Sequence, residues 1–263
     1  SDDRALMFSA FDSGWDVKAL LRLIVTSQTY QQSSQATPEL RVRDPENRLL
    51  ACGPRYRLPA EMIRDNALAV SGLLIERIGG PSVKPYQPAG LWKEMRNDSY
   101  EQDHGSALYR RSLYTYRKRS VPPPSLNAFD APDRETSCVR RQRTNTPLMA
   151  LVTLNDPTFV EAARALAQRL LTEGPMANAS PEQRFARAFQ LTLARDPKPA
   201  EAEVFMRVLR RQQSVYAQDQ AAAAELITVG ESPRDEQLDA AEHAAWTVVA
   251  NVLLNMDEFL TKE

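Results

Sequence analysis

Glycine is scarce in this chain, with 9 residues of 263, whereas proline is plentiful, with 18. All-β sandwiches and barrels need many glycine-rich turns, so the shortage argues against those classes. Proline is tolerated in the first turn of a helix, where its missing N–H would have no partner in any case. Hydrophobic residues make up 43% and charged residues 25%, as in globular proteins with a substantial core. The composition therefore predicts a mainly α fold.

Cysteine and histidine are also rare, with two of each. No CxxC or CxxCH pattern occurs, which excludes zinc-ribbon and haem-attachment motifs within this chain. Cys52 and Cys138 could pair in an oxidising compartment or be two unrelated buried thiols, and both alternatives stay open. His104 lies in a polar segment and is expected to be exposed and without a functional role. His243 lies in a helical segment without HExxH and is expected at its rim, so we predict no metal site and no cofactor in this chain.

No apolar run reaches the roughly 20 residues that a membrane helix needs. Residues 1–15 have no basic region followed by an apolar region, so no secretory leader is expected in this stretch. The chain begins at Ser1 rather than at a methionine, and we expect it to be a piece of a longer protein. The missing leader therefore gives no information about location.

Two helices are predicted in residues 1–80. Residues 16–33 repeat apolar positions at three- and four-residue steps, with Asp16 as the capping residue. Residues 34–57 are polar and irregular, with a turn at "DPENR". A second helix is expected to begin near Pro59 and to end at Gly79-Gly80, because proline marks helix starts and glycine helix ends.

Residues 81–143 are predicted to form a proline- and arginine-rich connector. Aromatic and β-branched residues in 107–121 favour one or two short strands, although a helix is an open alternative. The "PPPS" of residues 122–125 predicts extended polyproline geometry, and residues 126–143 a loop. The connector carries nine basic and three acidic residues in 105–143. This excess either lies on an acidic helical layer or forms an anion-binding surface.

Residues 144–263 are predicted to be a helical bundle. Four helices are expected to begin at Pro147, Pro157, Pro181 and Pro199, and a fifth to run from about 236 to 260. Each proline follows a polar residue, and three of the four helices carry an acidic residue in their first turns, which the helix dipole favours. The pattern "NDPTFVEA" is therefore explained as a helix start, and no catalytic role is needed to account for it. The domain prediction is a single helical module over 1–263, with a partly extended middle segment.

One loop concentrates the candidate binding residues. It holds arginines that grip carboxylates, sulfates or phosphates in a bidentate fork, next to a helix start that also attracts anions. The alternative is an internal network in which these arginines pair with acids and cap helix ends. The low isoelectric point of about 6.2 and the lack of a nucleic-acid-binding motif argue against nucleic acid. The candidate ligand-binding residues are Asp130, Asp133, Arg134, Arg140, Arg141, Arg143 and Asn145.

Several stretches resemble one family in the same order along the chain, from about residue 12 to residue 263. They include "RYRLPAEMIRDNALAVSGLL", "VPPPSLNAFDAPDRETSCVRRQRTNTPLMALVTLNDPTFVEAARALAQRLL" and "AAWTVVANVLLNMDEFLTKE". The chain resembles domain of unknown function 1553, the C-terminal module of large planctomycete cytochrome-c-type proteins. The resemblance implies a periplasmic or otherwise extracytoplasmic parent with a c-type haem in another domain. It brings no catalytic residues.

The leading hypothesis from the sequence is a non-catalytic or co-catalytic module of such a haem protein. Its partners would be the other domains of the same chain and possible anionic glycans, bound by the arginine-rich loop. The alternative is an enzyme domain that acts on sulfated or acidic polysaccharide, in which Asp130, Asp133 and Glu135 would transfer protons.

Overall fold

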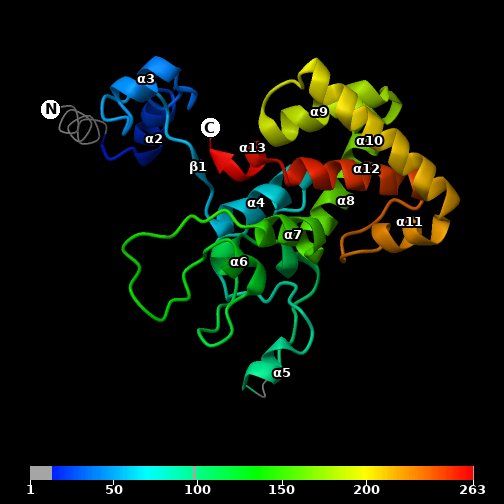
Figure 1. The fold of residues 1–263 in the computed structure, drawn as a ribbon. Helices are drawn as coiled ribbons and strands as arrows, with labels where there is room; N and C mark the ends of the chain where they lie inside the picture. Colours follow the sequence, from blue (N-terminus) through cyan, green and yellow to red (C-terminus); the bar gives the residue numbers. More distant parts are fainter. Residues whose placement is uncertain (1–13, 97–98, 263) are drawn as a thin grey trace. The chain divides into compact units, whose positions relative to one another are not determined.

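The computed structural model describes residues 14–96 and 99–262 (Figure 1). The expectation of no leader in residues 1–15 falls almost entirely outside these ranges. Compact unit 1 comprises residues 1–56 and 261–263, and compact unit 2 comprises residues 57–260. The predicted mainly α class is confirmed, and the sheet in the described part of the chain has two strands, β1 (Tyr56–Arg57) and β2 (Thr261–Lys262).

Unit 1 contains helices α2 (Val17–Val25) and α3 (Pro38–Arg43). The Oδ1 atom of Asp16 accepts a hydrogen bond from the Ala19 N–H at 2.9 Å, as a helix cap should. The predicted helix 16–33 was too long. The hydroxyls of Thr26 and Ser27 donate to carbonyls of the preceding turn and compete with the backbone ladder there. The short α3, capped by Thr37, lies in a segment predicted to be irregular.

Unit 2 begins with α4 (Ala60–Ser71). The prediction that this helix ends at Gly79-Gly80 was wrong, because the chain leaves the helix at Gly72. That residue has φ of 79°, in the left-handed region that suits glycine. The amides of Leu73 and Leu74 both donate to the carbonyl of Leu68 and close the end of the helix.

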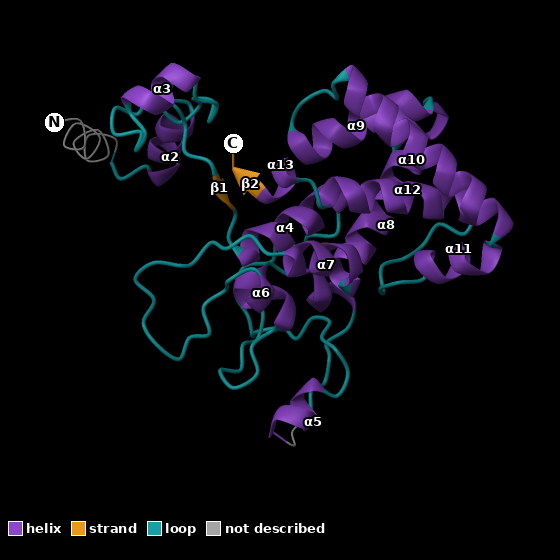
Figure 2. Ribbon diagram, viewed as in Figure 1, coloured by secondary structure: helices purple, strands orange, loops and turns teal. Residues whose placement is uncertain are grey.

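The middle segment differs from its prediction (Figure 2). Residues 107–121 form two short 3-10 helices, η1 (Gly105–Tyr109) and η2 (Ser112–Tyr114), and the predicted strands are reduced to isolated bridges. The "PPPS" stretch is not wholly extended, because Pro124 begins helix α6 (Pro124–Ala128). A further short helix, α5 (Leu91–Arg96), interrupts the predicted loop.

The proline-marked helix starts are confirmed in α7 (Pro147–Asn155), α8 (Pro157–Thr172), α9 (Pro181–Leu193) and α10 (Pro199–Gln218). The predicted fifth helix is shorter, as α12 (Ala240–Leu254), and is followed by α13 (Asp257–Leu260). Asp239 caps α12 and fixes its start, which is later than expected. The remaining elements are η3 (Gly174–Asn178) and α11 (Gln220–Ile227).

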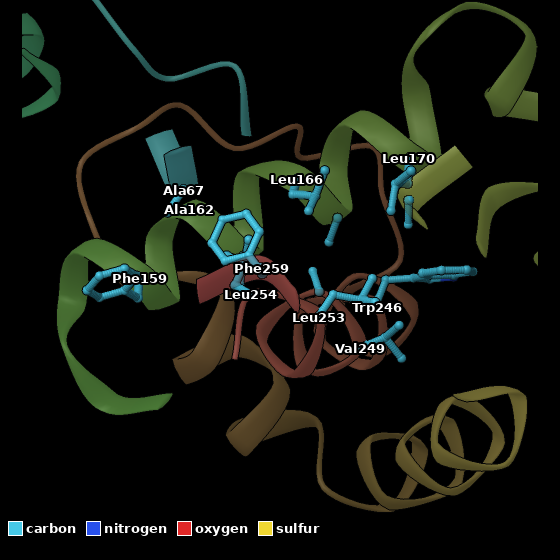
Figure 3. Packing of buried hydrophobic residues seen from close by; sticks show 14 of the residues in the cluster. Ala67, Phe159, Ala162, Leu166, Leu170, Trp246, Val249, Leu253, Leu254 and Phe259 are labelled. Carbon is cyan, nitrogen blue, oxygen red and sulfur yellow. The ribbon is translucent and has the colours of Figure 1, made fainter. Parts of the chain in front are cut away.

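The main core of unit 2 lies between α8 and α12, which pack against each other along their length, with α4 on α8 and α10 on α12. Leu166 and Leu170 of α8 lie on the side facing Trp246 and Leu253 of α12 (Figure 3). Truncating such a fully buried leucine to alanine costs about 2–5 kcal/mol. This packed pair of helices is the rigid base from which the loops of unit 2 extend.

Candidate anion-binding loop

The arginine-rich loop runs from α6 to α7 (Figure 1), and its two ends are tied together at Asp130. The Asp130 carboxylate accepts hydrogen bonds from the Thr144 N–H at 2.7 Å and from the Thr144 hydroxyl at 3.0 Å. Arg57 completes the tie. Its Nη2 lies 2.5 Å from Asp130 Oδ2, and its Nε donates to the Thr144 carbonyl at 2.9 Å. The two ends of the loop are thus joined to each other and to Arg57, at the start of unit 2.

A second attachment holds one arginine of the loop. Arg141 Nη1 lies 2.7 Å from Glu61 Oε2, and Arg117 Nη2 lies 2.7 Å from Glu61 Oε1. Burial acts to raise the pKa of the Glu61 carboxyl, but backbone hydrogen bonding and these two guanidinium groups outweigh it and lower the pKa. Glu61 is therefore held as an anion between two cations, and Arg141 is partly neutralised.

Two guanidinium groups remain unpaired. Arg134 and Arg140 are exposed, and neither forms a hydrogen bond or ion pair with another residue in the described ranges. Arg143 is also exposed, but it has an interaction partner. Asn145 is exposed. The loop therefore presents positive charge to solvent at two of its four arginines.

The loop encloses a polar hollow of about 550 Å³. Among the predicted site residues, Asp130, Asp133, Arg140 and Arg141 line this hollow, whereas Arg134, Arg143 and Asn145 do not. The rest of the lining is Asn127, Ala131, Pro132, Thr136, Ser137, Cys138, Val139 and Gln142. The structure thus brings four of the seven predicted residues together around one space.

Two of the three acidic side chains of the loop, those of Asp130 and Asp133, are used for structure. Asp130 ties the loop ends, and Asp133 Oδ1 accepts from the Glu135 N–H at 3.0 Å in a local turn. Such an aspartate turn stabilises the chain reversal around Arg134, whose φ of 66° is left-handed. The loop geometry accounts for both aspartates without proton transfer.

A comparison with protein families finds a match. The profile of the family described as "Protein of unknown function (DUF1553)" matches residues 5–209, which is well over half of the chain. The chain belongs to this family. A search of curated proteins and a search of solved structures each found no match. The match agrees with the resemblance seen in the sequence, and α11 and α12 lie beyond the matched residues of this DUF1553 member.

Three residues that complete the loop site in this DUF1553 protein were missed by sequence reasoning: Arg57, Glu61 and Arg117. Arg57 and Glu61 precede the loop by some 70–80 positions, at the start of unit 2. Nothing in the local pattern around them marks an ion-pair partner. Three arginines of the basic connector, Arg111, Arg117 and Arg141, pair with Glu61 and Glu76, so these charges are balanced by acids that precede the connector.

A buried polar cluster in the same unit was also missed. The carboxylate of Glu161 on α8 is 1% exposed, and it accepts from the Tyr109 hydroxyl at 2.7 Å and the Ser232 N–H at 2.6 Å. Arg164, equally buried, donates to the carbonyls of Val229 and Ser232 and to the Ser232 hydroxyl. The contacts with Val229 and Ser232 fix the segment after α11 to α8, and the contact with Tyr109 fixes η1 to α8, which indicates a structural role.

The two histidines have roles other than those expected. His243 is fully buried rather than at a rim, with its Nε2 3.1 Å from the Arg164 carbonyl oxygen, and burial lowers its pKa. His104 is exposed but not idle, because its Nδ1 lies 2.6 Å from Glu231 Oε1. Cys52 and Cys138 are both free thiols. Within the described ranges, no group of three or more histidine, cysteine or acidic side chains could hold a metal ion.

No helix in the described part of this family member is long and apolar enough to cross a membrane.

Proposed function

We propose that this chain is a binding module for anionic ligands, with acidic or sulfated glycans as the expected class, and that the arginine-rich loop between α6 and α7 is its binding surface. One observation carries the proposal. Arg134 and Arg140 are exposed and have no partner among the described residues, on a loop whose ends are tied by Asp130.

The tie supports binding because it reduces the conformational entropy lost when a ligand orders the loop. A loop that was open at its base would have to close before its guanidinium groups could meet one ligand. Guanidinium groups match sulfate and carboxylate oxygens in a planar bidentate geometry. The polar lining of the hollow, with backbone and hydroxyl groups around Arg140, suits a hydrated, hydroxyl-rich ligand such as a glycan.

Hydrolysis by the same loop has less support. An acid–base pair needs two carboxyl groups that are available to a substrate. Asp130 already accepts hydrogen bonds from Thr144 and forms an ion pair with Arg57, and Asp133 accepts a hydrogen bond from the Glu135 amide. Of the three acids of the loop, this leaves the exposed Glu135 as the one whose carboxylate has no such contact among the described residues. We therefore favour binding over catalysis.

We further propose that the chain works outside the cytoplasm, joined to other domains of a larger protein that carries a c-type haem. The support is membership of the DUF1553 family together with the resemblance described above. The test is fractionation of cells that express the full-length gene product, followed by haem staining. Recovery of a haem-free product in the cytoplasm would contradict this part of the proposal.

The class of ligand can be tested with a matched glycan panel. The purified chain would be titrated with dextran sulfate, alginate and neutral dextran of similar length. We expect binding to dextran sulfate and alginate but not to dextran, and weaker binding as salt screens the exposed charges. Equal binding to neutral dextran, or no binding to any of the three, would overturn the proposal.

A further inference from the structure

A second cavity lies in unit 2, apart from the arginine loop and different in chemistry. Its volume is about 520 Å³, within the range of small-molecule sites. It is formed mainly by α6, α7 and the start of α8, and its walls are mostly apolar. The lining residues are Tyr86, Gln87, Pro88, Pro124, Ser125, Ala128, Leu148, Leu151, Val152, Asn155, Asp156 and Pro157.

The apolar part of the lining is open to solvent. Leu148 and Leu151 lie one turn apart on α7 and are 55% and 56% exposed. Pro124 and Pro157, which begin α6 and α8, add rigid apolar walls. Large aliphatic side chains in this position favour an apolar ligand body, since burying them removes apolar surface from water.

One charged residue, Asp156, occurs among the described residues that line this cavity. Its Oδ1 accepts from the Thr158 N–H at 2.9 Å, which fixes the carboxylate at the start of α8. Burial raises the pKa of this carboxyl, against the opposing hydrogen bonds from Thr158 and the attraction of Arg64. Arg64 gives its own hydrogen bonds to the carbonyls of Leu108 and Arg110 and to the Ser112 hydroxyl.

The helix dipoles at this point largely offset each other. Asp156 is both the residue that follows α7 and the cap of α8, so the negative end of one helix meets the positive end of the next. The last turn of α7 contains no basic residue. The negative charge of the Asp156 carboxylate therefore remains the main electrostatic feature of an otherwise apolar space.

We propose that this cavity binds a small aliphatic amine, with its alkyl chain against Leu148 and Leu151 and its ammonium group at Asp156. An ammonium group supplies hydrogen-bond donors and a positive charge to a desolvated carboxylate, and the alkyl chain covers the exposed leucines. The proposal is independent of the anion-binding loop, because it concerns a different space and a ligand of the opposite charge.

The test uses three probes with the same chain length: n-hexylamine, n-hexanol and hexanoate. Binding at neutral pH would be followed by NMR chemical-shift changes in α7 and at Asp156. We expect hexylamine to bind about tenfold more tightly than hexanol, as one half-buried charge pair would give, and hexanoate to bind least. The proposal is overturned if hexylamine binds no better than hexanol, or if neither binds.

Two variants separate the contribution of the ammonium group from that of the alkyl chain. Asp156→Asn keeps a side chain that caps helices as well as aspartate does, so the fold is expected to persist. It should reduce hexylamine binding to the level of hexanol while leaving hexanol unchanged. Leu151→Ser should weaken both probes. If Asp156→Asn keeps the full preference for the amine, the carboxylate does not select the ligand and the proposal fails.

Discussion

Arg57 and Asp130 are 73 positions apart in the sequence, and the Nη2 atom of Arg57 lies 2.5 Å from the Oδ2 atom of Asp130. Both side chains are largely shielded from solvent, at 10% and 17% exposed. The same carboxylate also accepts from Thr144, so one aspartate fixes both ends of a loop of fifteen residues, 130–144. The exposed Arg134 and Arg140 lie in the part of the chain between the two ends that this tie joins.

Replacing Asp130 with alanine should open the loop. The Thr144 amide and the Arg57 guanidinium would lose their acceptor, which we expect to lower the free energy of unfolding by about 1–3 kcal/mol. The loop would also open locally, so trypsin should cut faster after its arginines under native conditions. The matched control is Asp133→Ala, which removes one local turn bond. Equal cleavage rates for the two variants would contradict the assignment of Asp130 as the tie.

Gly230 must lack a side chain. Its φ is +89°, and a Cβ atom placed there would lie 2.2 Å from the buried Cδ of Glu161. Gly230→Ala should therefore lower the unfolding free energy by roughly 3 kcal/mol or more, measured by denaturant titration. Gly174→Ala is the control, since its φ is +53° and no atom lies within 4 Å of the position that an alanine methyl group would take. That variant should lose only about 1 kcal/mol. Similar losses at both sites would refute the close packing described for Gly230.

Two residues that precede a helix-starting proline differ in their capping, so their contributions to stability can be compared. Ser180 forms a full capping box with Gln183 at the start of α9, whereas Thr146 makes no side-chain cap bond at the start of α7. Ser180→Ala should cost about 1 kcal/mol of stability, and Thr146→Ala a few tenths at most. Thermal unfolding of the two variants tests this difference. A larger loss of stability for Thr146→Ala than for Ser180→Ala would be inconsistent with the observed caps.

Glu201 gives a contribution to stability that depends on pH. Hydrogen bonds from Arg195 lower the pKa of the Glu201 carboxyl to about 2. Because the folded pKa is below that of the unfolded chain, the stabilisation is complete above about pH 4.5 and is lost as the pH falls towards 2. Glu201→Gln should cost about 1 kcal/mol at pH 7 after solvent screening, and clearly less near pH 2, where about half of the folded carboxyl groups are protonated. Glu203→Gln, which removes an exposed pair with Arg207, should show little effect at either pH. A pH-independent loss for Glu201→Gln would count against this linkage.

The sequence predicted the helix starts of unit 2 well, because a polar residue before a proline acts locally and needs no distant partner. It failed at the end of α4, where the helix ends at the single Gly72 rather than at the Gly79-Gly80 pair, because glycine content alone does not distinguish the two stop signals. The arginine loop could be recognised from its composition. Its tie to Arg57 could not, since a long-range ion pair leaves no periodic trace in the sequence. The burial of Glu161 was likewise hidden, because an acid early in a helix is usually exposed.

The central claim is that Arg134 and Arg140 bind an anionic ligand. The most direct measurement is the affinity for dextran sulfate of the Arg134→Ala/Arg140→Ala variant, at fixed salt and with unchanged melting temperature. Its control is Arg210→Ala/Arg211→Ala, which removes two exposed arginines of α10 and leaves the same net charge. We predict that the loop variant binds at least about tenfold more weakly than the wild type and the control stays within about twofold. Equal affinities for the two variants would contradict the account.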